Sequence, residues 1–226
     1  MNRDKGRYDA NGRLTVAVAG ASSLVGMMLL ERLERVEDVR TVALVRSPTT
    51  LPADEVIPDW MSSNAATSAM READVLVNLS GEMFSRSADV YRDANVRTTE
   101  LVAGALRSGR ARRAILISYP GADPDSPNLF LKTKGQAERL LLASGKDAVV
   151  FRCPAIINTP DDPGPFEANM MAERGSVQTL GSGRQRWRPV YRGDVAEAIS
   201  AAVERGAAGI YDLTGPEEMT LDHLIR

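Results

Sequence analysis

Two glycines six residues apart are the first residues whose types and spacing indicate chemistry. They enclose the stretch Gly20-Ala-Ser-Ser-Leu-Val-Gly26, which follows an apolar run and precedes a helical pattern. At such a strand-to-helix turn, backbone N–H groups and the helix dipole together bind the pyrophosphate of a dinucleotide. The residues predicted to make these contacts are Gly20, Ser22, Ser23, Leu24, Val25 and Gly26.

Ser23 stands where the usual spacing would place another glycine. Its side chain either crowds the pyrophosphate or donates a hydroxyl hydrogen bond to it. An alternative for the whole turn is structural, because Gly20 can supply an unusual backbone angle and Gly26 can allow close packing. A Walker-type phosphate loop is excluded, since Met27 and Met28 occupy the positions of its Lys and its Ser or Thr.

The residue after the second apolar run indicates which dinucleotide is bound. A free 2′-hydroxyl on the adenosine ribose is usually held by Asp or Glu, whereas a 2′-phosphate pairs with Arg. The sequence has Arg46 here, and no acidic residue follows before Asp54. Guanidinium–phosphate pairs are strong and geometrically specific, so we expect NADP(H) in preference to NAD(H). The alternative is a solvated Arg at a strand end.

The order of apolar segments predicts the fold that positions these residues. Unbroken apolar runs, typical of strands covered on both faces, lie at 14–19, 41–45, 74–79, 114–117 and 148–151. Helical spacing lies at 24–36, 87–106 and 129–143. The alternation predicts an α/β fold with a doubly wound parallel sheet, the Rossmann arrangement. In 87–106, the residues expected along one buried side are Val90, Ala94, Thr98, Leu101, Val102 and Leu106.

After Pro154 the chain is rich in Pro and Gly, so a loop is predicted to leave the sheet. Beyond it we expect a short helix at 166–174, a strand-like piece at 188–191, a helix at 194–205 capped by Asp194, a strand at 210–213 and a helix from Thr220. The prediction is one domain over 1–226, in which 155–226 form a small lobe on the substrate side.

Composition excludes several classes of protein. The formal charge of −2 gives no basic excess for nucleic acid, and the apolar stretch 14–30 is interrupted and flanked by acidic residues, unlike an export signal. No other run reaches the length of a membrane span. With one cysteine and one histidine, neither a disulfide, a metal cluster nor a Cys-His pair is expected. The predicted location is the cytoplasm.

Several segments occur in the order and spacing of the short-chain dehydrogenase/reductase superfamily: VAVAGASSLVG, DVLVNLSGE, AILIS, VVFRCPAII, PVYRGDVAEAI and YDLTGPEEMT. Over roughly residues 14–225 the chain resembles the extended and atypical branches of this superfamily. These branches include NmrA-like proteins, the NAD(P)H-binding accessory subunit of respiratory complex I and proteins similar to sugar-nucleotide epimerases and dehydratases.

The resemblance implies a catalytic site in which a Ser orients the substrate, a Tyr exchanges the proton, and a Lys one helical turn later binds the nicotinamide ribose. By position, Ser118, Lys134 and Asn95 match members of this set. The Tyr position is Phe130, which has no phenol to donate; losing a positioned general acid typically costs ~10²–10⁴ in rate. Tyr119, beside Ser118, is the candidate replacement. Cofactor contacts are further implied for Asn78, Leu79, Ser80, Gly81, Lys134, Pro154 and Ile156.

Three functions follow from these observations. The first is an NADP(H)-dependent oxidoreductase or epimerase-like enzyme acting on an unidentified small molecule. The second is a non-catalytic NAD(P)H-binding sensor or assembly protein. The third is a lyase or cyclase on the same fold without net redox change. Extended members of the superfamily often dimerise through the helices equivalent to 87–106 and 129–143, so a homodimer is expected.

Overall fold

A computed structural model of the chain describes residues 12–158 and 186–220. Its centre is a sheet of seven parallel strands in the order β10-β6-β5-β4-β1-β2-β3. The strands are β1 (Leu14–Ala19), β2 (Val39–Leu44), β3 (Glu55–Ile57), β4 (Val75–Asn78), β5 (Arg113–Ser118), β6 (Asp147–Arg152) and β10 (Gly209–Asp212). The predicted doubly wound α/β fold is confirmed.

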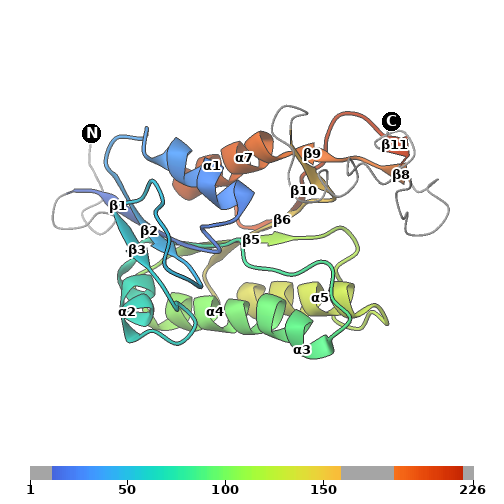
Figure 1. The fold of residues 1–226 in the computed structure, drawn as a ribbon, viewed down its shortest axis with the longest axis horizontal. Coiled ribbons are helices and arrows are strands. Elements are labelled where there is room, and N and C mark those ends of the chain that lie inside the picture. Colours follow the sequence, from blue (N-terminus) through green and yellow to red (C-terminus); the bar gives the residue numbers. More distant parts are fainter. Residues whose placement is uncertain (1–11, 159–185, 221–226) are drawn as a thin grey trace.

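Helices cover both faces of this sheet (Figure 1). On one face lie α1 (Leu24–Leu33) and α7 (Arg192–Glu204), which pack against each other. On the other face lie α2 (Asn64–Glu72), α4 (Thr98–Ser108) and α5 (Leu129–Leu142). The sheet therefore separates two apolar cores, as its unbroken apolar strands require.

The side chains of strand β1 alternate between the two apolar cores. Val16 and Val18 point to the core beneath α1 and α7, whereas Ala17 and Ala19 point to the core beneath α2, α4 and α5. Because successive side chains of a strand face opposite sides, every position of Leu14–Ala19 is buried. The functional groups are thereby confined to the strand ends.

The predicted helix over 87–106 is interrupted. It consists of α3 (Ala88–Tyr91), a π-helical turn (Arg92–Arg97) and α4. Val90, expected on its buried side, is 45% exposed, and Ala94 and Leu101 are half-buried, whereas Tyr91 and Asn95 are buried. A π turn takes one more residue than an α turn, so helical spacing continued backwards from α4 is offset by about one residue.

Other boundaries also differ from the sequence prediction. Strand β3 and helix α2 were not expected, and Asp194 lies in the first turn of α7 rather than at its cap, which is Tyr191. Within the piece predicted at 188–191 only β9 (Val190–Tyr191) is a strand, and a further short strand, β8 (Arg186–Trp187), precedes it. The partners of β8 and β9 are β11 (Met219–Thr220) and β7 (Ile156–Ile157). Thr220 itself lies in β11, and the helix predicted from it otherwise falls outside the described residues.

The helix predicted at 166–174 lies outside the described residues. Within the described ranges, the helices are too short or too polar for any of them to cross a lipid bilayer.

Candidate functional site

The turn after β1 approaches the end of β4 too closely for a side chain. Gly20 has φ +76°, and a Cβ there would lie 2.8 Å from the Ser80 backbone nitrogen and 2.9 Å from the Leu79 carbonyl carbon. Only glycine combines that backbone angle with that approach. The turn therefore leaves an open groove of about 380 Å³ at the carboxyl ends of β1, β2 and β4. Its lining includes Gly20, Ser22, Ser23, Arg46, Trp60, Met61, Leu79, Ser80 and Gly81.

Ser23 and Gly26 have structural roles in this turn. Ser23 is the N-cap of α1, and its Oγ accepts a hydrogen bond of 3.1 Å from the Gly26 N–H. Gly26 is buried with its Cα against the backbone of Ala21, so the packing interpretation holds for this glycine. The N–H groups of Leu24 and Val25, at the positive end of the helix dipole, have no acceptor within the helix. The cap leaves them available to an anion.

Arg46 and Trp60 lie at the other end of the groove. Arg46 follows β2, is exposed, and pairs with no carboxylate among the described residues. Met61 adds apolar surface to the same groove, whereas Trp60 borders it but is only 2% exposed and belongs to the core. The exposed guanidinium is therefore the group of this part of the groove that a ligand could reach.

Lys134 is buried on α5 and faces the end of β5. It is 7% exposed, and its Nζ donates a 3.1 Å hydrogen bond to the Ile117 carbonyl. Burial lowers the pKa of Lys134 to about 8, against weaker opposing effects of Cys153 and Glu138. Gly81 makes room for this ammonium group, since a Cβ there would lie 2.9 Å from Nζ.

Ser118 hydrogen-bonds to a buried ion pair, formed by Glu138 and Arg152, that the sequence analysis did not predict. Its Oγ donates a hydrogen bond to Glu138 Oε1 at 2.5 Å. The Arg152 guanidinium donates two hydrogen bonds, of 2.9 and 2.7 Å, to the same carboxylate. Hydrogen bonding to Glu138 raises the pKa of Arg152, so the guanidinium stays charged. Glu138 lies one turn after Lys134 on α5, a spacing that could have marked it as a second polar residue on the buried side.

Two asparagines of the predicted set are fully buried and hold the backbone around the site. Asn95, in the π-helical turn, accepts from the Glu82 N–H at 3.2 Å and donates to the Glu82 carbonyl and to Thr133 Oγ1. Asn78 accepts from the Ser80 N–H and donates to Thr99 Oγ1, each at 3.0 Å. Both side chains therefore position the segment after β4.

Tyr119 and Phe130 form one wall of a cavity beside Lys134. Their rings meet edge to face, with centroids 5.1 Å apart. Burial raises the pKa of the Tyr119 phenol above its usual value, so it keeps its proton at neutral pH. Phe130 lies one turn before Lys134 on α5 and lines the same cavity. The position implied for a phenol by the resemblance is thus an apolar ring with a phenol next to it.

The cavity has a volume of about 270 Å³ and lies at the ends of β4, β5 and β6. Its lining brings together the predicted residues Leu79, Gly81, Ser118, Tyr119, Lys134, Pro154 and Ile156. We call it the inner cavity. It also contains Met83, Phe84, Cys153 and Trp187, which sequence reasoning assigned no ligand contact. Burial raises the pKa of the Cys153 thiol to about 12, so the thiol is inert near neutral pH.

The groove and the inner cavity meet at Leu79, Gly81 and Glu82, which line both. Together they run from the Arg46 end, past the start of α1, to Lys134. Ligands of open α/β sheets bind along this edge, outside the carboxyl ends of the strands. The Gly20 turn, the free N–H groups of α1 and the buried Lys134 fit a dinucleotide laid along it. Within 12–158 and 186–220, no three His, Cys, Asp or Glu side chains gather as metal ligands.

Comparisons with known proteins agree with this arrangement. Residues 20–205 match a family described as NAD(P)H-binding. The chain is 28% identical over 233 residues to NADH dehydrogenase [ubiquinone] 1 alpha subcomplex subunit 9, mitochondrial, of Arabidopsis thaliana. It is 24% identical over 212 residues to the ceramide reductase of Caulobacter vibrioides. These alignments include 97% and 91% of this chain but only 58% and 65% of the relatives, so the chain spans about three fifths of their length.

Solved structures of low sequence identity share the fold. UDP-glucuronic acid 4-epimerase from Bacillus cereus, in complex with NAD, superposes with a TM-score of 0.77 at 16% identity, over 92% of this chain and 80% of that one. The Bordetella bronchiseptica enzyme WbmH, in complex with NAD+, gives 0.78 at 16% identity over 94% and 80%. The expected likeness to the extended branch of the superfamily is confirmed at the level of the fold.

Proposed function

This chain belongs to the NAD(P)H-binding family, and from that premise we propose that it is an NADPH-dependent reductase of a small carbonyl compound held in the inner cavity. The observation that carries the proposal is the inner cavity itself, which places a phenol and a buried ammonium beside the edge where a dinucleotide fits.

The phenol of Tyr119 is the proton donor in this proposal. When bound, NADPH supplies a hydride to the carbonyl carbon, and the carbonyl oxygen takes the Tyr119 proton, giving an alcohol. The Tyr119 hydroxyl hydrogen-bonds to no described residue, whereas the Ser118 proton is engaged by Glu138. Lys134 donates to the nicotinamide ribose and favours the phenolate that Tyr119 leaves behind. Solvent restores the proton.

The rate of NADPH oxidation by two variants tests this assignment. Tyr119→Phe is expected to lower the rate of NADPH oxidation with a panel of short aldehydes by ~10²-fold or more, the usual effect of losing a positioned acid. Phe130→Tyr is expected to raise the rate, because it adds a phenol one turn from Lys134. The NADPH affinity of each variant, measured by calorimetry, is the control for an intact site. An unchanged rate in Tyr119→Phe would remove Tyr119 from the mechanism.

A second candidate, a protein that holds NADPH without turnover, is favoured by one specific observation. Phe130 replaces the phenol, and Ser118 is bonded to Glu138 instead of facing a substrate. In that case the wild-type protein oxidises no NADPH with any aldehyde, and turnover arises only in Phe130→Tyr. The similarity to a respiratory-chain subunit makes a protein partner part of this candidate.

NADPH is proposed in preference to NADH because Arg46 is exposed at the groove and uncommitted. Arg46→Ala is expected to weaken NADPH binding about 10-fold or more, the loss of one charge-assisted pair, and to leave NADH binding within about twofold, since NADH has no 2′-phosphate. Calorimetric titration with each nucleotide measures both effects. Equal weakening of the two nucleotides would place Arg46 outside the 2′ position.

A further inference from the structure

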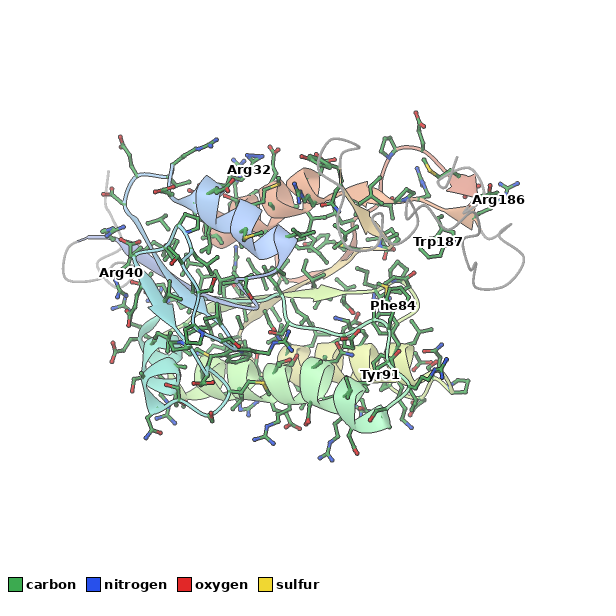
Figure 2. The ribbon with its side chains drawn as sticks, in the orientation of Figure 1. Arg32, Arg40, Phe84, Tyr91, Arg186 and Trp187 are labelled. Atoms are coloured by element: carbon green, nitrogen blue, oxygen red, sulfur yellow. The ribbon has the colours of Figure 1, made fainter. Side chains whose placement is uncertain are left out.

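The inner cavity continues into a second one. The outer cavity, as we call it, has a volume of about 630 Å³. Five residues line both cavities and form the passage between them: Met83, Phe84, Tyr119, Phe130 and Trp187. Figure 2 shows Phe84 and Trp187 at the same end of the molecule, with Tyr91 nearby. The polar end of the site, at Lys134, therefore opens outward through an aromatic and methionine-lined passage.

The outer cavity presents apolar surface to a ligand. Tyr91 contributes its ring, because its hydroxyl is already used: it donates to the Met83 carbonyl at 2.9 Å and accepts from the Ser85 N–H at 3.1 Å. The Tyr91 ring lies 6.1 Å from that of Phe130, and Leu131 completes this side.

Three residues of the outer lining are polar throughout their side chains: Ser85, Arg86 and Asn128. Ser85 Oγ accepts from the Ser87 N–H, and Asn128 caps α5 by accepting from the Leu131 N–H. The other lining residues are aromatic or aliphatic, so most of the outer wall is apolar.

Phe84 lies at the passage between the two cavities. It is 58% exposed, the most exposed large apolar side chain among the described residues. A single exposed apolar residue is ordinary, but Phe84 stands at the wall shared by two cavities. A ligand that spans both would bury its ring.

We propose that the substrate carries an unbranched aliphatic chain, with its carbonyl in the inner cavity beside Tyr119 and Lys134 and its chain in the outer cavity. This inference rests on the proposed reductase function, because it names the class of compound reduced. A small polar substrate such as a sugar would leave the aromatic passage and most of the apolar outer wall uncovered.

Binding of a homologous series tests the inference without requiring turnover. Straight-chain primary alcohols of increasing length, which NADPH cannot reduce, are titrated into the full chain saturated with NADPH, with calorimetry as the readout. Affinity is expected to rise about two- to fourfold per methylene, the effect of burying each CH₂, until the outer cavity is filled. An affinity independent of length would overturn the proposal.

The variant Phe84→Glu tests whether the aliphatic chain runs through the passage. A carboxylate at the passage is expected to remove most of the length dependence. Leu142→Glu, on another exposed apolar side chain at the C-terminal end of α5, is the control and keeps the wild-type slope. The same slope in both variants would mean that the chains bind elsewhere.

Aldehydes of the same lengths separate this inference from the reductase proposal. Reduction whose kcat/KM rises with chain length supports both. Length-dependent alcohol binding without aldehyde reduction supports the chain site and contradicts the reductase. Reduction of a short aldehyde with no gain for longer ones keeps the reductase and contradicts the chain site.

Discussion

Ser22→Glu is expected to weaken NADPH binding by at least ~100-fold, since placing like charges together at a binding interface costs several kcal/mol. Ser22 is exposed and lines the groove where α1 begins. A carboxylate there would face the pyrophosphate and would also occupy the anion position at the helix N-terminus. Calorimetric titration of the purified variant, checked to be free of nucleotide, gives the affinity.

Two variants make that result specific. Ser22→Ala removes the hydroxyl without adding charge, and we expect its affinity to stay within about threefold of wild type, the size of one exposed hydrogen bond. Ser108→Glu adds the same charge at an exposed position of α4, which lines none of the three cavities described here, and should bind like wild type. Unchanged NADPH binding in Ser22→Glu would mean that the groove at Gly20 does not hold the pyrophosphate.

Glu138→Leu is expected to lower the free energy of unfolding by about 3 kcal/mol, because removing one partner of a buried ion pair leaves the other charge uncompensated. The Arg152 side chain is 25% exposed, which places the effect at the lower end for such pairs. Ser118 would lose its acceptor as well. Urea unfolding followed by circular dichroism measures the change.

The double variant Glu138→Leu, Arg152→Leu distinguishes the ion pair from simple packing. Replacing both members of a buried pair by apolar side chains is often neutral or stabilising, so the double variant should recover most of the lost stability. If it were as unstable as the sum of the single variants, the pair would not act as a unit.

The sheet could be predicted from the sequence because its strands are short apolar runs buried on both faces. Leu14–Ala19 is recovered with its bounds, and the other predicted strands overlap β2, β4, β5, β6 and β10. Strand β3 was missed because Glu55–Ile57 is three residues long and begins with a charge. Helix α2 was missed because only Ala66 and Met70 of its nine residues are buried, too few to give a visible period.

The site could be predicted as far as parallel strands bring their ends together. Gly20, Arg46 and Gly81 follow three different strands and Lys134 lies on α5, and the fold places them along one edge. What sequence spacing could not give is the partner of each side chain. That Ser118 donates to Glu138 instead of to a ligand depends on the packing of α5 on β5 and β6. Cytoplasmic location, dimerisation and a separate lobe over 155–226 stay predictions.

Trp187 is a second case in which sequence spacing could not predict a residue's neighbours in the site. It comes from the segment after the Pro-rich loop, far from Phe84 and Phe130 in sequence, yet it lines both cavities with them. No local pattern marks such a residue. Only the antiparallel pairing of β8 with β11 and the position of β9 beside β7 bring that segment to the site.

The pairing of β10 with β6 has a consequence for the order of folding. Gly209 pairs with Val149, so this edge strand joins the sheet only after a long chain segment closes, and that segment includes Trp187. Closing a long loop costs entropy before any contact repays it. We therefore expect the pairs that close shorter segments, β1–β2, β2–β3, β4–β5 and β5–β6, to form first. The two pairings that close much longer segments, β1 with β4 and β10 with β6, are expected to form last. Trp187 would reach the cavity wall in the same late step, so that the ligand site is completed when folding ends.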